Sequence, residues 1–148
     1  MTKDLTLKMT VEKAPEHVYR AINDVGSWWS GQVKGATDRL GGEFAYRYGT
    51  MHYSRQKVVE LEPGRRIVWR VEEADLTFVA ARSEWKGTQI VFDLAPKGRG
   101  TEISFTHVGL GPTLECYDGC ASGWQALILT NLRNRILTGA AQPDLFAE

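Results

Sequence analysis

The period of the hydrophobic pattern changes once along this chain, and that change constrains the fold more than any other feature. Between residues 43 and 108, apolar and polar residues alternate in several short runs, which is typical of half-buried β-strands. From residue 112 to residue 138 the apolar residues recur instead at helical spacing, and Gly139 stands where such a helix would end. An antiparallel run of strands followed by one long helix predicts an α+β domain.

Six segments are predicted to be strands. The hairpin TQIVFDLAPKGRGTEISFTHV is the clearest, because two alternating runs flank a Pro-Lys-Gly-Arg-Gly turn. The segment GQVKGATDRLGG is rich in glycine and has no sustained period, so we expect a loop there. Residues 74–85 are apolar without a clear period, and we expect an irregular connection or a short strand. The predicted strands are residues 3–12, 43–48, 52–62, 66–72, 88–95 and 101–108.

Helices are expected on both sides of this strand-rich region. Ala14 and Pro15 open a first helix that should end between Asn23 and Gly26, and a short second turn is expected around residues 27–30. The C-terminal helix, residues 112–138, is long enough to cross a small sheet. Its apolar face is predicted to carry Tyr117, Cys120, Ala121, Trp124, Leu127, Ile128 and Leu132.

Length and charge limit the classes of partner. The chain has the size of one domain, which we expect to span residues 1–148. Its 18 basic residues balance 18 acidic ones, so neither a nucleic acid nor an anionic membrane surface is an expected partner. No apolar run approaches the ~20 residues of a membrane span, and the N-terminus has no apolar signal segment. We therefore expect a cytoplasmic protein.

Several motifs, in this order, resemble one known superfamily. The opening strand is followed by APEHVYRAINDVGSWWSG, GGEFAYRY, LEPGRRIVWRV, TQIVFDLAPKGRGTEISFTHVGL and GWQALILTNLRNRILTG. Together they resemble the START-like, SRPBCC superfamily over residues 3–140, and within it the branch called activator of heat-shock protein 90 ATPase, homologue-1-like. The resemblance implies a helix-grip fold, in which a curved antiparallel sheet of about six strands wraps around a long C-terminal helix, with two short helices after the first strand.

The same resemblance implies an apolar cavity between the helix and the concave face of the sheet. Members of the wider superfamily bind lipids, sterols, polyketides or aromatic plant metabolites, and some catalyse cyclisation or hydroxylation with extra domains or cofactors. We expect this chain to depart from the two-domain co-chaperones, without the N-terminal domain through which they engage their ATPase, so stimulation of that ATPase is not expected. It also lacks the paired Cys and His motifs of an iron–sulfur cluster, so we expect no cofactor.

Aromatic residues dominate the set expected to line the cavity, although the same residues could simply fill the core. Trp28 and Trp29 are adjacent and cannot both face one core in regular structure, so in one interpretation one of them packs and the other guards the cavity mouth; the interpretation that we favour is that both close the helix onto the sheet. The predicted cavity residues are Trp29, Phe44, Tyr46, Trp69, Trp85, Phe92, Phe105, His107, Tyr117, Cys120, Trp124 and Ile128.

The two cysteines and three histidines are the other candidates for chemistry. Cys116 and Cys120 lie four residues apart on the predicted helix, which places them poorly for a disulfide, and no paired motif supplies the further ligands of a zinc site. We therefore expect the thiols to be part of the cavity wall and no metal to be bound. His107 lies on the same strand face as Ile103 and Phe105, so it is the one candidate for a general base; the interpretation that we favour is a structural histidine near the end of the strand.

The leading hypothesis is a small-molecule binding module that holds an apolar or aromatic ligand, lipid-like or polyketide-like, between the sheet and the C-terminal helix. Two alternatives stay open. One is a cyclase- or hydrolase-like enzyme acting in the same cavity, and the other is a chaperone-associated interaction domain with an ATPase partner. A homodimer is compatible with any of the three.

Overall fold

One curved antiparallel sheet, with helices on a single face, makes up the domain. The computed structural model describes residues 4–29, 32–48, 52–76, 85–110 and 117–139. In those residues the sheet has seven strands, in the order β1-β7-β6-β5-β4-β3-β2, and all neighbours are antiparallel. The strands are β1 (Leu5–Val11), β2 (Gln32–Gly35), β3 (Glu43–Tyr48), β4 (His52–Glu62), β5 (Arg66–Leu76), β6 (Gln89–Lys97) and β7 (Gly100–Val108).

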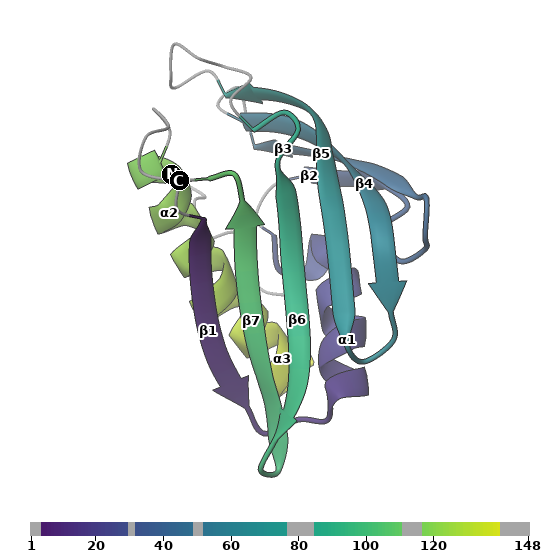
Figure 1. Cartoon of the computed structure of the whole chain (residues 1–148), viewed down its shortest axis with the longest axis vertical. Helices are drawn as coiled ribbons and strands as arrows, with labels where there is room; N and C mark the ends of the chain where they lie inside the picture. Colours follow the sequence, from purple (N-terminus) through teal and green to yellow (C-terminus); the bar gives the residue numbers. More distant parts are fainter. Residues whose placement is uncertain (1–3, 30–31, 49–51, 77–84, 111–116, 140–148) are drawn as a thin grey trace.

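The helices all pack on the concave face, which lies behind the sheet in Figure 1. Helix α1 (Pro15–Asn23) follows β1 and contacts β6 and β7, whereas the end of the C-terminal helix contacts β1. The core between the two layers contains the largest buried side chains, several of which are tryptophans and phenylalanines. This arrangement confirms the predicted α+β architecture.

Two details of the prediction are corrected. The strand count is seven rather than six, because the glycine-rich segment expected to be a loop contains the four-residue edge strand β2, paired with β3. The second short helix is a single 3-10 turn, η1 (Val25–Ser27), which begins before the predicted residues 27–30. Part of the irregular connection predicted at residues 74–85 is the end of β5, which continues to Leu76, and residues 77–84 lie outside the described residues.

The C-terminal helix is continuous through the described residues and has three parts: α2 (Tyr117–Ala126), a π-helical segment η2 (Leu127–Leu132) and α3 (Arg133–Thr138). It ends at Gly139, whose left-handed φ of 77° is the conformation expected of a helix-terminating glycine. The predicted start at residue 112 lies outside the described residues. The predicted buried face is confirmed at Cys120, Ala121, Trp124, Leu127, Ile128 and Leu132.

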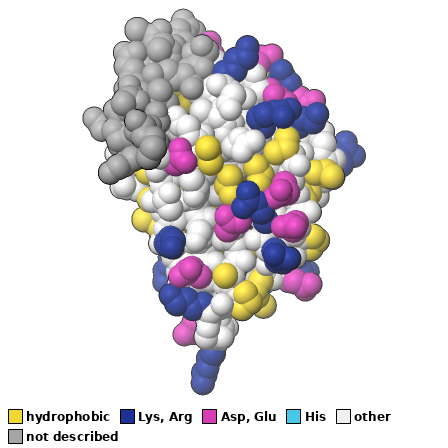
Figure 2. Space-filling model, in the orientation of Figure 1, with side chains coloured by type: hydrophobic (Ala, Val, Ile, Leu, Met, Phe, Trp, Pro, Cys, Tyr) yellow, Lys and Arg dark blue, Asp and Glu magenta, His cyan; other side chains and the backbone are white. Residues whose placement is uncertain are grey.

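The convex face of the sheet is mixed in charge. In Figure 2, which has the orientation of Figure 1, basic and acidic side chains are interspersed with hydrophobic ones over the strands, without a large field of one sign. Ion pairs such as Lys97–Glu102 and Arg66–Asp93 account for part of this pattern. None of the described helices is long and apolar enough to cross a membrane.

Candidate functional site

The predicted cavity residues whose side chains are described meet in one buried cluster between the sheet and the C-terminal helix. The side chain of Tyr117 lies outside the described part. Each of the others is at most 7% exposed: Trp29, Phe44, Tyr46, Trp69, Trp85, Phe92, Phe105, His107, Cys120, Trp124 and Ile128. We call this set, together with Trp28, the aromatic cluster.

Both tryptophans of the Trp-Trp pair belong to the cluster, which agrees with the favoured interpretation that both close the helix onto the sheet and not with the one in which one of them guards a cavity mouth. Trp28 and Trp29 are 1% and 3% exposed, and their rings are nearly parallel with centroids 6.2 Å apart. They can face the same way because they follow a 3-10 turn, with Trp28 at φ −134° and ψ −23°, and so escape the alternation of a strand. The indole N–H of Trp28 donates to the carbonyl of Ile22, and Asn131 on η2 donates to the carbonyl of Trp28.

The Trp29 ring packs against aromatic rings of two strands of the sheet. It stacks on Tyr46 of β3, with centroids 4.1 Å apart and an interplanar angle of 14°. It is also parallel to Trp69 of β5 within 4°, with centroids 6.0 Å apart. Since β4 runs between β3 and β5, the Trp29 ring lies over the inward face of β4, and we call its place beside Tyr46 and Trp69 the slot.

A second stack fixes His107 in the cluster. Trp85 and Trp124 are parallel within 8°, and their centroids are 5.8 Å apart. The indole N–H of Trp124 donates to His107 Nδ1 at 3.0 Å, so the other ring nitrogen, Nε2, carries the proton and donates to the Thr88 hydroxyl at 2.8 Å. The Thr88 hydroxyl in turn donates to the carbonyl of Trp85.

Burial holds His107 in its neutral form. Its side chain is inaccessible to solvent, and burial, reinforced by the nearby His52, lowers its pKa from 6.5 to about 3. A general base needs a free lone pair, and the only one on neutral His107 accepts from Trp124. Cys120 is also buried, and its sulfur accepts from the indole N–H of Trp85 at 3.2 Å. Cys116 lies outside the described residues.

Three polar residues of β4 that sequence reasoning missed form the floor of the slot. His52, Ser54 and Gln56 alternate along the strand and share the inward face with Val58, and we call the three the polar row. The Gln56 amide donates a hydrogen bond to the Ser54 hydroxyl oxygen. The hydroxyl can then donate its own proton to His52 Nε2, which lies 3.1 Å away. Burial lowers the pKa of His52 to about 4, so this histidine is also neutral at pH 7.

Two polar atoms in this region have no partner within the described residues. The side-chain oxygen of Gln56 and the indole nitrogen of Trp69 are both buried and make no hydrogen bond there. Buried side-chain donors and acceptors are paired in the large majority of cases, so these two unpaired atoms are candidates for binding a further polar group.

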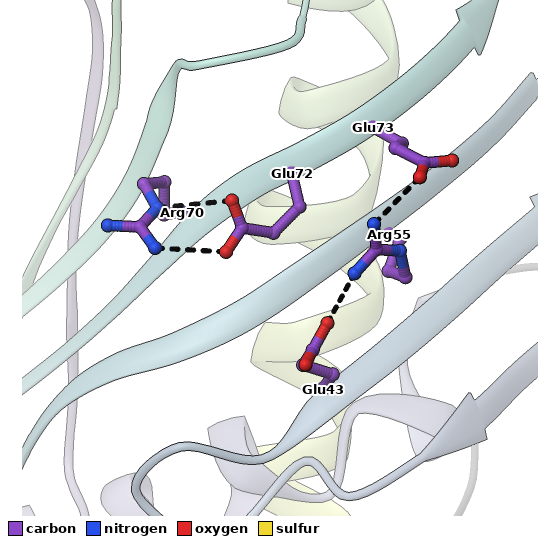
Figure 3. Close-up of polar contacts among 5 residues, drawn as sticks. All are labelled: Glu43, Arg55, Arg70, Glu72 and Glu73. Carbon is purple, nitrogen blue, oxygen red and sulfur yellow. Dashed lines mark hydrogen bonds and ion pairs between the residues drawn. The ribbon is translucent and has the colours of Figure 1, made fainter.

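Ion pairs lie on the side of the sheet opposite to the polar row. Arg55 lies between Ser54 and Gln56 in sequence and points outward, where it bridges Glu43 on β3 and Glu73 on β5 (Figure 3). Farther along β5, Arg70 pairs with Glu72 on the same face. A slip of one residue would turn Arg55 into the core and the polar row to solvent, so the register is strongly specified.

A separate cleft of about 400 Å³ opens beside α1, away from the predicted residues. It is lined by Tyr19, Arg20, Asn23, Asp24, Thr37 and Asp38. In the part of the chain that the structure describes, no group of three or more His, Cys, Asp or Glu side chains is placed to hold a metal ion.

Comparison with known proteins places this geometry in a family. The family model described as activator of Hsp90 ATPase homologue 1-like protein matches residues 13–136. No curated protein matches the chain.

Solved structures share the fold. The solution structure of the Aha1 dimer from Colwellia psychrerythraea has a TM-score of 0.74 at 21% identity, and the match covers 93% of this chain and 98% of that one. A protein from Chromobacterium violaceum has a TM-score of 0.69 at 23% identity, covering 90% and 96%. DynU16, a protein in the dynemicin biosynthetic locus, has a TM-score of 0.68 at 16% identity, covering 93% of this chain and 48% of that one.

Proposed function

The chain belongs to the family of activator of Hsp90 ATPase homologue 1-like proteins, and from this premise we propose that it is a binding domain for an apolar or aromatic small molecule. The ligand is held between the concave face of the sheet and the C-terminal helix. The observation that carries the proposal is the slot beside Tyr46 and Trp69, where the Trp29 ring is nearly parallel to both of these rings.

In this proposal the Trp29 ring occupies the ligand position when no ligand is bound. It comes from a non-regular segment after η1, whereas the slot walls belong to β3 and β5, so the ring can leave while the walls stay in place. A flat aromatic ligand would then make the stacking contacts that Trp29 makes with Tyr46. Because the ligand must displace this ring, only molecules in which the ring has left the slot can bind it. The apparent affinity is therefore the intrinsic affinity multiplied by the fraction of such molecules.

We assign no catalytic role to His107, the candidate base. Both of its ring nitrogens are engaged, Nδ1 by Trp124 and Nε2 by Thr88, and its low pKa opposes proton uptake at pH 7. A binding function needs neither a free lone pair nor a proton acceptor, so it fits this environment better than acid–base chemistry does.

Thermal unfolding against a panel of fatty acids, sterols, flavonoids and small planar aromatics tests the proposal. A ligand at a hundred times its Kd adds about 2.7 kcal/mol of stability, which raises the Tm of a domain of this size by roughly 5–10 °C. The panel should be repeated with Trp29→Ala, which empties the slot, and with Arg55→Gln, a control on the outer face of β4.

Planar aromatics are expected to raise the Tm of the wild type and to raise that of Trp29→Ala further, because no ring has to be displaced. Arg55→Gln should respond as the wild type does. No shift in either the wild type or Trp29→Ala, with both proteins folded, would rule out ligand binding in this slot.

A further inference from the structure

The two residues that carry the unpaired atoms are neighbours in the sheet. In the β4–β5 ladder Gln56 is opposite Val71 and Val58 is opposite Trp69, so Gln56 and Trp69 are diagonal neighbours on the inward face. Diagonal side chains of this kind are within reach of one another when they are long or aromatic. Phe44, which is opposite Gln56 on β3, also contacts the Trp69 ring, with centroids 5.0 Å apart.

The two atoms have complementary character. The Gln56 oxygen accepts a hydrogen bond and the Trp69 indole N–H donates one, and each is buried without a partner in the described residues. A hydroxyl group satisfies both at once, because it gives its proton to the oxygen and offers a lone pair to the N–H. A ketone lacks the proton for Gln56, and an ammonium group lacks the lone pair for Trp69.

We propose that Gln56 and Trp69 bind a hydroxyl group of the ligand, so that the ligand of this slot is a neutral, hydroxylated aromatic compound. The inference rests on the proposed binding function and adds the polar group that the site recognises. A hydroxyl on a ring lying in the place of Trp29 would lie above β4, where the polar row forms the floor.

The surroundings disfavour an ionised ligand. His52 and His107 are the basic side chains in ring contact with the cluster in the described residues, and burial keeps both neutral at pH 7. A carboxylate in the slot would therefore lose its water without gaining a cationic partner, and one of its oxygens would face the Gln56 oxygen. This chemistry favours a phenol over an ionised fatty acid.

Isothermal titration calorimetry with three matched probes tests the inference: 2-naphthol, 2-methylnaphthalene and 2-naphthoate at pH 7. The wild type is expected to bind 2-naphthol at least ~10-fold more tightly than 2-methylnaphthalene, because only the hydroxyl pairs the two buried atoms, and to bind 2-naphthoate more weakly than either. Trp69→Phe, which keeps a ring but removes the N–H, should reduce the preference for the hydroxyl to below ~3-fold.

Gln56→Leu is the second variant, since it removes the acceptor by a different substitution, and it should reduce the preference in the same way. Arg55→Gln, on the outer face of the same strand, should keep the wild-type preference. Equal binding of 2-naphthol and 2-methylnaphthalene by the wild type would overturn the hydroxyl site and leave the binding function standing. An unchanged preference in both variants would also overturn it, whereas no binding of any probe by the wild type or by Trp29→Ala would count against the binding function itself.

Discussion

Acid should destabilise this protein well above the pH at which carboxylates titrate, because its core contains neutral histidines. The pKa of His107 is lowered from 6.5 to about 3 in the folded protein, chiefly by burial. A group with a depressed folded-state pKa contributes its full stability above the unfolded-state pKa of 6.5 and loses it as the pH falls toward the folded-state value. The window for His107 is therefore about pH 6.5 to 3.

The size of the effect follows from the two pKa values. At pH 5 an unfolded histidine is almost fully protonated, and folding must release that proton, so His107 removes about 2 kcal/mol of stability relative to pH 7. His52, whose pKa is lowered to about 4, adds a similar loss. Together they predict a decrease of about 4 kcal/mol between pH 7 and pH 5.

Urea unfolding at pH 7, 6 and 5 measures this decrease, and His107→Gln is the informative variant. Glutamine can accept from Trp124 and donate to Thr88 as His107 does, but it does not titrate. The variant should lose about 2 kcal/mol less than the wild type between pH 7 and pH 5. Thr106→Val, on the neighbouring residue of β7, should follow the wild type. If His107→Gln and the wild type lost equal stability over this range, the assignment of a neutral, buried His107 would be refuted.

Three further substitutions test the packing around the site by urea unfolding. Gly100→Ala should prevent folding, because the added Cβ would lie 1.9 Å from the carbonyl oxygen of Val11; a variant as stable as the wild type would contradict this close approach. Gly123→Ala in α2 should stabilise by about 0.5–1 kcal/mol, since the new methyl meets nothing within 4 Å and alanine favours the helix; a loss of stability would show that this turn is packed. Asn131→Ala should cost about 1–3 kcal/mol by leaving the buried carbonyl of Trp28 without its donor, and no measurable change would argue against that bond.

The alternation of the strands and the apolar stripe of the helix were enough to predict most of the fold. β7 illustrates this, because Ile103, Phe105 and His107 share one face in the sequence pattern and are all buried in the structure. The edge strand β2 could not be found in the same way. It has four residues, of which only Val33 is apolar, and its pairing with β3 supplies a reason for extended structure that no local pattern contains.

The candidate site was predicted only in its aromatic part, for a physical reason. Aromatic residues at alternating positions of a strand indicate by themselves which face is buried. The polar residues His52, Ser54 and Gln56 instead indicate the solvent face of β4, unless Val58 is used to decide which face is inward. Once that face is known, three polar residues in a row at inward positions are the signal for a polar floor. The parallel arrangement of the Trp28 and Trp29 rings could not be predicted from the sequence, because it depends on the backbone conformation after a 3-10 turn and not on the hydrophobic period of a helix or strand.

The indole N–H groups of Trp124 and Trp69 differ in whether they form a hydrogen bond within the protein. Trp124 donates its N–H to His107, but the N–H of Trp69 is buried without a partner in the described residues. The change from indole to phenyl removes similar packing at both positions, whereas Trp124→Phe also leaves His107 Nδ1 without its donor. Trp69→Phe removes an N–H that makes no hydrogen bond in the described residues. Trp69→Phe should therefore destabilise the unliganded protein by about 1–3 kcal/mol less than Trp124→Phe does, as measured by urea unfolding at pH 7. If the two variants lost equal free energy of unfolding, Trp69 would have a hydrogen-bond partner in the unliganded protein. That result would contradict the argument that its N–H is available to a ligand.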